Sequence, residues 1–171
     1  MTHRIGFSHI ALPNARVLIL GSLPGVESLR CRQYYGKKEN GFWGIMGELV
    51  GASPDIPYVD RLSRLKDKKI ALWDVCASAK RMGSLDSNIQ PLTIVPNDFG
   101  SFFKAHKHIE LICFNGQPAE KLFRRFVLVT LPPALAALRR EVLPSTSPAH
   151  AKMRFEEKLQ RWGEVLCDFI D

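Results

Sequence analysis

Short, strongly apolar runs recur along the chain and are separated by longer segments of mixed polarity. Runs of this length that are apolar at nearly every position are typical of strands that are buried on both faces of a sheet. The pattern predicts strands at about residues 16–20, at Ile70–Val75 and at Ile109–Phe114, and a shorter one at Glu141–Leu143.

The segments between these runs carry apolar residues at helical spacing. A helix is expected over about residues 40–50, with Phe42, Ile45, Met46 and Leu49 on its inner side. Further helices are expected at residues 58–66, after a cap at Asn97, at residues 118–126 and at the C-terminal end around Trp162. Strands that alternate with helices predict an α/β fold of three αβα layers, with a central, mostly parallel sheet of four strands.

Two segments are less regular. Residues 78–96 are polar and are expected to form a long loop, which in a compact domain is more often functional than idle. Residues 127–131 could form a strand, which Pro132-Pro133 would end.

The carboxyl ends of parallel strands meet at one edge of a sheet, where open α/β folds bind their ligands. The loops expected there are Gly21–Gly25, Asp74–Ser78, Asn115–Pro118 and Pro144–His150. Their polar residues are therefore expected to converge on one rim.

Composition narrows the class of protein. The 171 residues, 46% of them hydrophobic, suit one compact domain over 1–171, and no apolar run approaches the ~20 residues that span a bilayer. We expect a soluble, cytoplasmic protein, associated with the nucleoid if it is prokaryotic. The net charge of +7 favours a nucleic-acid partner over a merely basic surface.

The four cysteines predict no metal site. Cys31, Cys76, Cys113 and Cys167 form no C-x-x-C pair, and their spacing fits no zinc pattern. Reduced and mostly buried thiols are the expectation.

Aromatic residues follow the glycine-proline loop closely. Gly21 and Gly25 allow a sharp turn and close approach of a ligand, and Tyr34-Tyr35 and Asn40-Gly41-Phe42-Trp43 come next. Aromatic faces beside an amide suit a flat ligand with a hydrogen-bonding edge, such as a nucleobase.

These segments, in this order, resemble the uracil-DNA glycosylase superfamily. Gly21–Gly25 is similar to its water-activating loop, and Pro144–Pro148 is similar to its Ser/Pro loop. Residues 34–43 and 72–89 resemble the hypoxanthine-DNA glycosylase branch. The resemblance implies a monofunctional, monomeric enzyme without metal or cofactor that removes hypoxanthine by preference, and uracil as a further substrate, from DNA containing deoxyinosine or uracil.

One position departs from the faster uracil-cleaving members, which place Asp or Asn just before the proline of the first loop. Leu23 stands there and can neither orient nor deprotonate water. The resemblance implies that Asn40 takes the catalytic role; from the residues alone, a helix N-cap is the alternative. A neutral amide cannot act as a general base, so slow chemistry is expected.

The base is expected to bind beside Ser22, Leu23 and Pro24. Phe42 is expected to form its wall, although Phe42 could also be a core residue, and Trp43 is expected to pack inside. Asp74 and Asn115 are expected to read the base edge. An ionised carboxylate accepts from N1–H of hypoxanthine or N3–H of uracil. The alternatives are a structural acid at Asp74 and a turn residue at Asn115.

The remaining candidates would contact the DNA backbone. Basic side chains and hydroxyls suit phosphates, although each basic residue could equally be a solvated surface residue and each hydroxyl a helix cap. His150 could contact a phosphate or the base, or only pack. The candidates are Lys80, Arg81, Ser145, Thr146, Ser147, His150 and Lys152.

Two other functions stay open. The chain could be a nucleic-acid-binding module that lost its chemistry, which Leu23 favours, or a hydrolase of free nucleosides or nucleotides that uses the same pocket.

Overall fold

The computed structural model describes residues 2–170 and contains a central parallel sheet. Its order is β3-β2-β6-β7, formed by Ile70–Asp74, Val17–Gly21, Leu111–Asn115 and Arg139–Leu143. All neighbouring strands in this sheet run parallel, as the sequence predicts. The inner strands β2 and β6 are the most apolar because helices cover both of their faces.

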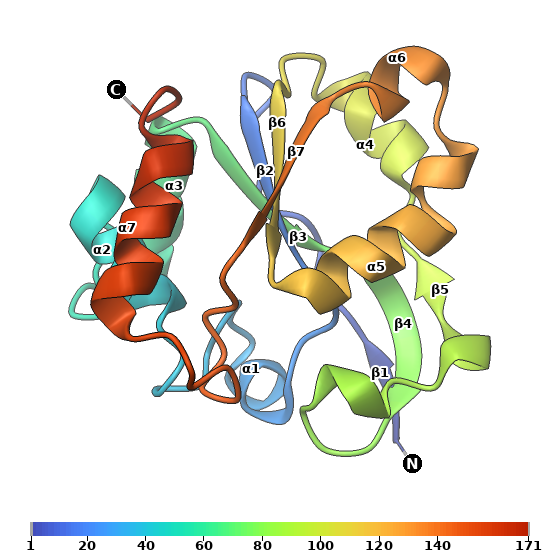
Figure 1. The fold of residues 1–171 in the computed structure, drawn as a ribbon, viewed down its shortest axis with the longest axis horizontal. Coiled ribbons are helices and arrows are strands. Elements are labelled where there is room, and N and C mark those ends of the chain that lie inside the picture. The colour runs from blue at the N-terminus through green and yellow to red at the C-terminus, as the bar shows by residue number, and fades with distance from the viewer. Residues whose placement is uncertain (1, 171) are drawn as a thin grey trace.

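Helices form the two outer layers (Figure 1). On one side lie α2 (Phe42–Val50), α3 (Tyr58–Asp67) and α7 (Phe155–Leu166), and on the other lie α4 (Phe99–Ala105) and α5 (Gln117–Phe126). Alternate residues of β2 point into the two cores: Val17 and Ile19 into one, Leu18 and Leu20 into the other. The expected three-layer αβα fold is confirmed.

Short elements fill the connections. α1 (Val26–Cys31) follows the first loop and α6 (Pro133–Ala136) precedes β7, while single 3₁₀ turns occupy Asp86–Asn88, Pro91–Thr93 and Leu128–Thr130. The last of these corrects the possible strand at residues 127–131, since this segment coils after α5 and pairs with no strand. The cap of α4 is Asp98, whose carboxylate accepts from Ser101 N, and not Asn97.

A second, antiparallel sheet takes up the two ends of the expected polar loop over residues 78–96, whereas residues 82–94 lie outside its strands. Its order is β1-β4-β5, formed by Thr2–Ile5, Cys76–Arg81 and Val95–Pro96. Strand β4 continues from β3 after a single residue and pairs with β1, with Thr2 opposite Arg81. The prediction was wrong because β4 owes its backbone partners to a segment more than seventy residues away in the sequence (76 − 5 = 71).

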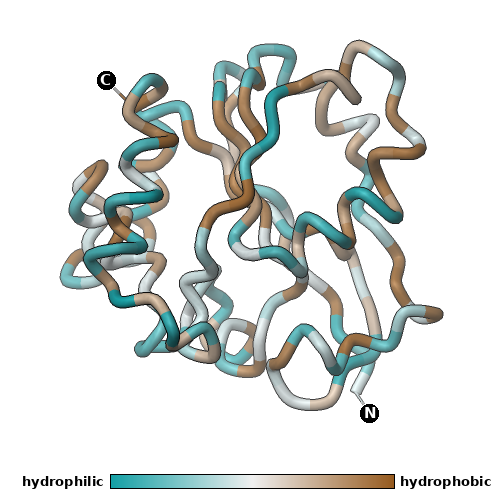
Figure 2. Tube along the Cα trace, viewed as in Figure 1, coloured by the Kyte–Doolittle hydropathy of each residue, from teal (hydrophilic) through white to brown (hydrophobic). Residues whose placement is uncertain are grey.

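Hydrophobic residues concentrate along the central strands and alternate with polar ones along the outer helices (Figure 2). This is the pattern of helices that bury one face on a sheet. Within residues 2–170, no helix is both long and apolar enough to cross a membrane.

Candidate active site

A cavity of about 490 Å³ opens at the carboxyl ends of β2, β3 and β6. Residues 21–25, Asp74, Asn115 and residues 145–149 line it. The expected convergence of these loops on one rim is therefore confirmed. The volume falls in the range of small-molecule pockets and accommodates a nucleobase.

The glycine-proline loop runs along one wall of this cavity. Its backbone continues the pairing beyond β2, with Cys76 N donating to Ser22 O at 3.0 Å. The Leu23 side chain is buried and packs with Cys76, Ala79 and Ile89. The side chain that carries polar chemistry in this loop is therefore Ser22.

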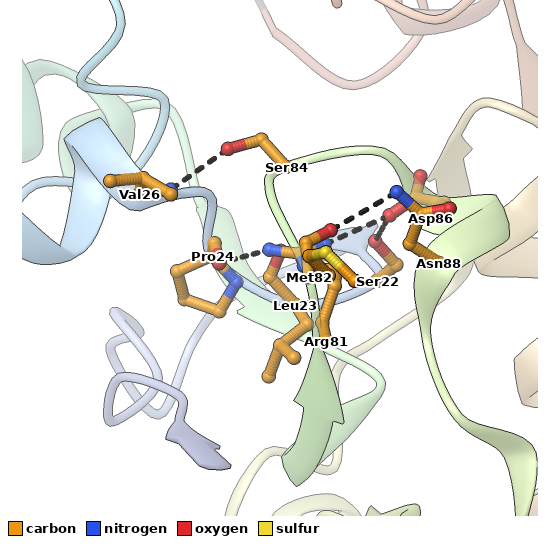
Figure 3. A network of polar contacts seen from close by, with 9 residues as sticks. All are labelled: Ser22, Leu23, Pro24, Val26, Arg81, Met82, Ser84, Asp86 and Asn88. Carbon is orange, nitrogen blue, oxygen red and sulfur yellow. Dashed lines mark hydrogen bonds and ion pairs between the residues drawn. The ribbon is translucent and has the colours of Figure 1, made fainter. Parts of the chain in front are cut away.

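Arg81 holds this loop from beneath (Figure 3). Nη2 of Arg81 donates to the carbonyl oxygens of Leu23, at 3.1 Å, and of Pro24. Arg81 is only 1% exposed, and burial lowers its pKa. The expectation that Arg81 contacts DNA phosphate is wrong, because its guanidinium is enclosed by the protein and directed at backbone carbonyls.

Ser22, Arg81 and Asp86 together form a carboxylate clamp, which the sequence analysis missed. Oδ1 of Asp86 accepts from Ser22 Oγ at 2.5 Å and from Arg81 Nη1 at 3.2 Å. Burial raises the pKa of Asp86, while the Ser22 hydrogen bond and the Arg81 charge act in the opposite direction. The sequence did contain a signal for Asp86, which is an acidic residue close to Gly83-Ser84 in the segment 72–89 that resembles the hypoxanthine-DNA glycosylase branch.

The pocket floor contains two buried polar atoms that have no hydrogen-bond partner among residues 2–170, Asp74 Oδ2 and Tyr35 Oη. Asp74 is 5% exposed and lies at the end of β3. Burial, reinforced by the charge of Asp86, raises its pKa to about 7. A side chain at Gly21 would overlap the Asp74 carboxylate, so glycine keeps this floor open.

Tyr35, rather than Phe42, forms the aromatic wall. Phe42 is fully buried, and the Tyr35 ring stacks on it at 4.0 Å between centroids. The expected wall residue, Phe42, therefore lies in the core behind Tyr35 and does not line the cavity. Tyr35 has a φ of 53°, in the left-handed region, and it lines the cavity together with Tyr34. Trp43 packs inside, as expected, and its Nε1 donates to Tyr34 O at 2.8 Å.

Asn40 also lines the cavity and lies one residue before Gly41, the N-cap of α2. Its Oδ1 accepts from Phe42 N at 2.9 Å in a turn that leads into the helix, so the amide supports the start of α2 without being its N-cap. This contact fixes the orientation of the amide and leaves its Nδ2 donor free of protein partners within the described chain. The alternative of a helix N-cap at Asn40 is therefore wrong, because Gly41 is the N-cap.

Asn115 and Thr146 join the third loop to the fourth. Asn115 Oδ1 accepts from Thr146 N at 2.9 Å, and its Nδ2 donates to Thr146 Oγ1 at 2.9 Å. Thr146 O in turn accepts from Gly41 N at 2.9 Å. Thr146 is 2% exposed, so the expected phosphate contact is wrong. Asn115 lines the cavity, but this pair of bonds makes it a positioning residue for the loop rather than a free reader of the base.

The Ser/Pro loop separates this cavity from a second hollow of about 580 Å³, and Ser145 and Ser147 line both. Helix α7 holds the loop at both ends, because Trp162 Nε1 donates to Pro144 O and Lys158 Nζ donates to His150 O. His150 lines the second hollow and is exposed, as are Lys80 and Lys152. These residues are placed where an outside partner can reach them.

Across residues 2–170, no group of three or more histidine, cysteine or acidic side chains is arranged to hold a metal ion. Cys76 and Cys113 are buried, Cys31 is partly buried and Cys167 is exposed. The polar side chains that line the cavity carry amide, hydroxyl, carboxylate and cationic groups, which suit hydrogen bonding to an organic ligand.

Comparison with known proteins agrees with this geometry. The Uracil DNA glycosylase superfamily matches residues 7–169. A Hypoxanthine DNA glycosylase of Methanosarcina acetivorans is 39% identical over 94% of this chain and 96% of its own, and one of Methanosarcina barkeri is 41% identical over 66% and 70%. The solution NMR structure of a protein assigned as a uracil DNA glycosylase from Methanosarcina acetivorans superimposes with a TM-score of 0.80 at 34% identity, covering 98% of this chain and 99% of that one. The chain belongs to the uracil DNA glycosylase superfamily and, within it, to the hypoxanthine branch.

Proposed function

We propose that this protein is a monofunctional DNA glycosylase that hydrolyses the N-glycosidic bond of deoxyinosine in DNA and leaves an abasic site. The observation that carries the proposal is the pocket floor, where a carboxylate oxygen and a phenol hydroxyl are buried without partners beneath an aromatic wall. Such groups are costly unless a ligand satisfies them. Both curated relatives are named Hypoxanthine DNA glycosylase, which supports the same reaction.

Asp74 would select the base by its hydrogen-bonding edge. Above its pKa of about 7 the carboxylate accepts a hydrogen bond from N1–H of hypoxanthine. Adenine has no hydrogen on N1 and cytosine has none on N3, so both would leave a buried negative charge unpaired. Uracil carries an equivalent N3–H and is the second candidate substrate.

Tyr35 would replace the stacking that a flipped base loses. An extruded base needs a flat apolar or aromatic surface, and the Tyr35 ring is held rigidly against Phe42. The unpartnered Tyr35 hydroxyl lies close to Gly21 and is available to the base as a donor.

Asn40 would assist departure of the base. Because its Oδ1 is occupied by Phe42 N, the free Nδ2 is a donor directed to charge that develops on the leaving hypoxanthine. Ser145, Ser147, His150, Lys80 and Lys152 would contact the DNA backbone around the opening.

Duplexes that each carry a single deoxyinosine, uracil, xanthine or thymine mismatch test this function when alkali is used to cut abasic sites. We expect strand breaks at deoxyinosine only after alkali, and a rate at least about 100-fold lower for Asn40→Ala, the cost of one transition-state donor. Asn14→Ala, an exposed amide in the turn before β2, is the matched control.

The alternatives give different results in the same assay. Binding of the deoxyinosine duplex without any break would indicate an inactive nucleic-acid-binding module. Release of base from free nucleosides would indicate a nucleoside hydrolase, and breaks without alkali would contradict a monofunctional enzyme.

A further inference from the structure

The residues assigned so far include no acceptor for the proton of the attacking water. We propose that Asp86 is a catalytic carboxylate that takes this proton and faces the positive charge on the deoxyribose, in place of the polar group that the first loop lacks at Leu23. This inference rests on the glycosylase function proposed above.

The reaction requires such a group. A water oxygen forms a bond to C1′ of the deoxyribose, and the C1′–N9 bond breaks with its electron pair going to hypoxanthine. One proton of the water must leave, and it passes to the Asp86 carboxylate. The hypoxanthine anion is then protonated by solvent or by Asp86 as it departs, which restores the carboxylate. The Asn40 amide cannot accept that proton.

Three carboxylates line the cavity, and their surroundings separate their roles. Asp74 is buried at the floor, where the proposed function uses it to read the base. Glu27 belongs to α1 and accepts from Arg30 at 2.8 Å, which lowers its pKa and makes it the weaker base. Asp86 remains, and it is bonded to the residue that precedes Leu23.

The carboxylate clamp places Asp86 beside the first loop and keeps one of its oxygens available. Ser22 and Arg81 both donate to Oδ1, and no described residue donates to Oδ2. The side chain is 36% exposed and lines the cavity, whereas Arg81 is enclosed behind it. A fixed acceptor beside the reacting atoms costs little reorganisation in the transition state.

Two neighbouring carboxylates in different surroundings support a division of labour. The charge of Asp86 raises the cost of charging Asp74, and Arg81 favours the charged form of both. Of these two carboxylates, however, it is Asp86 that Arg81 contacts directly, so Asp86 is the one held as a partnered anion.

Single-turnover excision from a duplex with one deoxyinosine tests this role. Asp86→Asn keeps an Oδ1 for Ser22 and Arg81 but cannot accept a proton. We expect its rate constant to fall by about 100-fold or more, the usual contribution of a general base. Its affinity for the duplex should not change, whereas its melting temperature should fall, because the buried Arg81 loses a charged partner. Glu27→Gln, which removes a carboxylate from the same cavity, should keep the wild-type rate.

Two further variants test the role of Asp86 independently of Asp86→Asn. Ser22→Ala keeps the ion pair but releases Asp86 from the 2.5 Å contact, so cleavage should slow while duplex binding stays unchanged. Formate should restore part of the rate to Asp86→Gly.

If the wild-type protein is active and the Asp86→Asn variant is equally active, the proposed role of Asp86 is wrong, while the glycosylase function is not contradicted. Unchanged cleavage by Ser22→Ala, or loss of duplex binding in parallel with loss of rate, would lead to the same conclusion. Wild-type protein that releases no hypoxanthine would instead contradict the proposed glycosylase function.

Discussion

The pocket floor and the carboxylate clamp lie in one cavity but differ in how far their polar groups are paired by hydrogen bonds. At the floor, Asp74 Oδ2 and Tyr35 Oη are buried and have no partner. In the clamp, Ser22, Arg81 and Asp86 bond to one another, and Arg81 also bonds to the loop backbone, which leaves the Arg81 Nε as a buried atom without a partner among residues 2–170. The floor therefore costs stability in the free protein, whereas the clamp supplies it.

This contrast distinguishes the residues that bind a ligand from the residues that position the loops. Polar groups that bind a ligand must stay without hydrogen-bond partners until the ligand is bound, and rigid surrounding residues must keep these groups from pairing with each other. We call these surrounding residues the frame; it consists of the carboxylate clamp and the Asn115–Thr146 pair. Asn115 and Thr146 belong to the frame, because their mutual hydrogen bonds satisfy both. Substitutions in the frame should lower stability, and substitutions at the floor should leave it unchanged or raise it.

The largest effect on stability is expected from Arg81→Met, which breaks the frame. The free energy of unfolding should fall by roughly 2–4 kcal/mol, because Asp86 loses its partner and two backbone carbonyls lose their buried donor. Urea unfolding measures this change, and Lys80→Met, on the exposed neighbour, is the control. A loss equal to that of the control would contradict the role of the clamp.

An intermediate effect that depends on pH is expected from Asp74→Asn. The folded pKa of about 7 lies above the ordinary 3.8, so the folded protein binds this proton more tightly than the unfolded chain. The resulting stability is fully present below about pH 4 and is lost as the pH rises through about 7.

Asp74→Asn should therefore melt above wild type at pH 8, by more than about 1 kcal/mol of unfolding free energy, the equivalent of about one pKa unit. The advantage should shrink towards pH 4. Thermal melting of both proteins across this pH range measures it, and an advantage independent of pH would contradict a buried, titrating Asp74.

The smallest effect on stability is expected from Tyr35→Phe, which removes only a buried hydroxyl without a partner. Stability should stay unchanged or rise by up to about 1 kcal/mol, since no hydrogen bond is lost. Excision of hypoxanthine should slow, because the base loses a donor. Chemical denaturation and single-turnover rates measure the two effects, and a clear loss of stability would show that the hydroxyl is partnered in solution.

Much of the fold could be predicted because its signals are local. Apolar runs mark β2, β3 and β6, and parallel strands bring the loops after them to one edge, so the first loop, Asp74 and Asn115 were correctly predicted to be neighbours. These inferences need only the period of the pattern and the geometry of a parallel sheet.

The rest depends on contacts between distant segments. Strand β1 has a weak pattern and exists through its pairing with β4. Arg81 looks like a surface cation until the carbonyls of Leu23 and Pro24 enclose it. Tyr34 and Tyr35 both line the cavity, and the residue pattern does not predict the left-handed backbone conformation of Tyr35.

The pairing of Thr2 with Arg81 has a practical consequence for anyone who handles this protein. The first strand of the described structure supports the strand that carries the guanidinium beneath the first loop. A purification tag or a truncation that disturbs residues 2–5 would therefore alter the shape of the cavity, although these residues do not line it. Tags are better placed at the other terminus, and sequence changes in this strand are best interpreted as changes to the cavity.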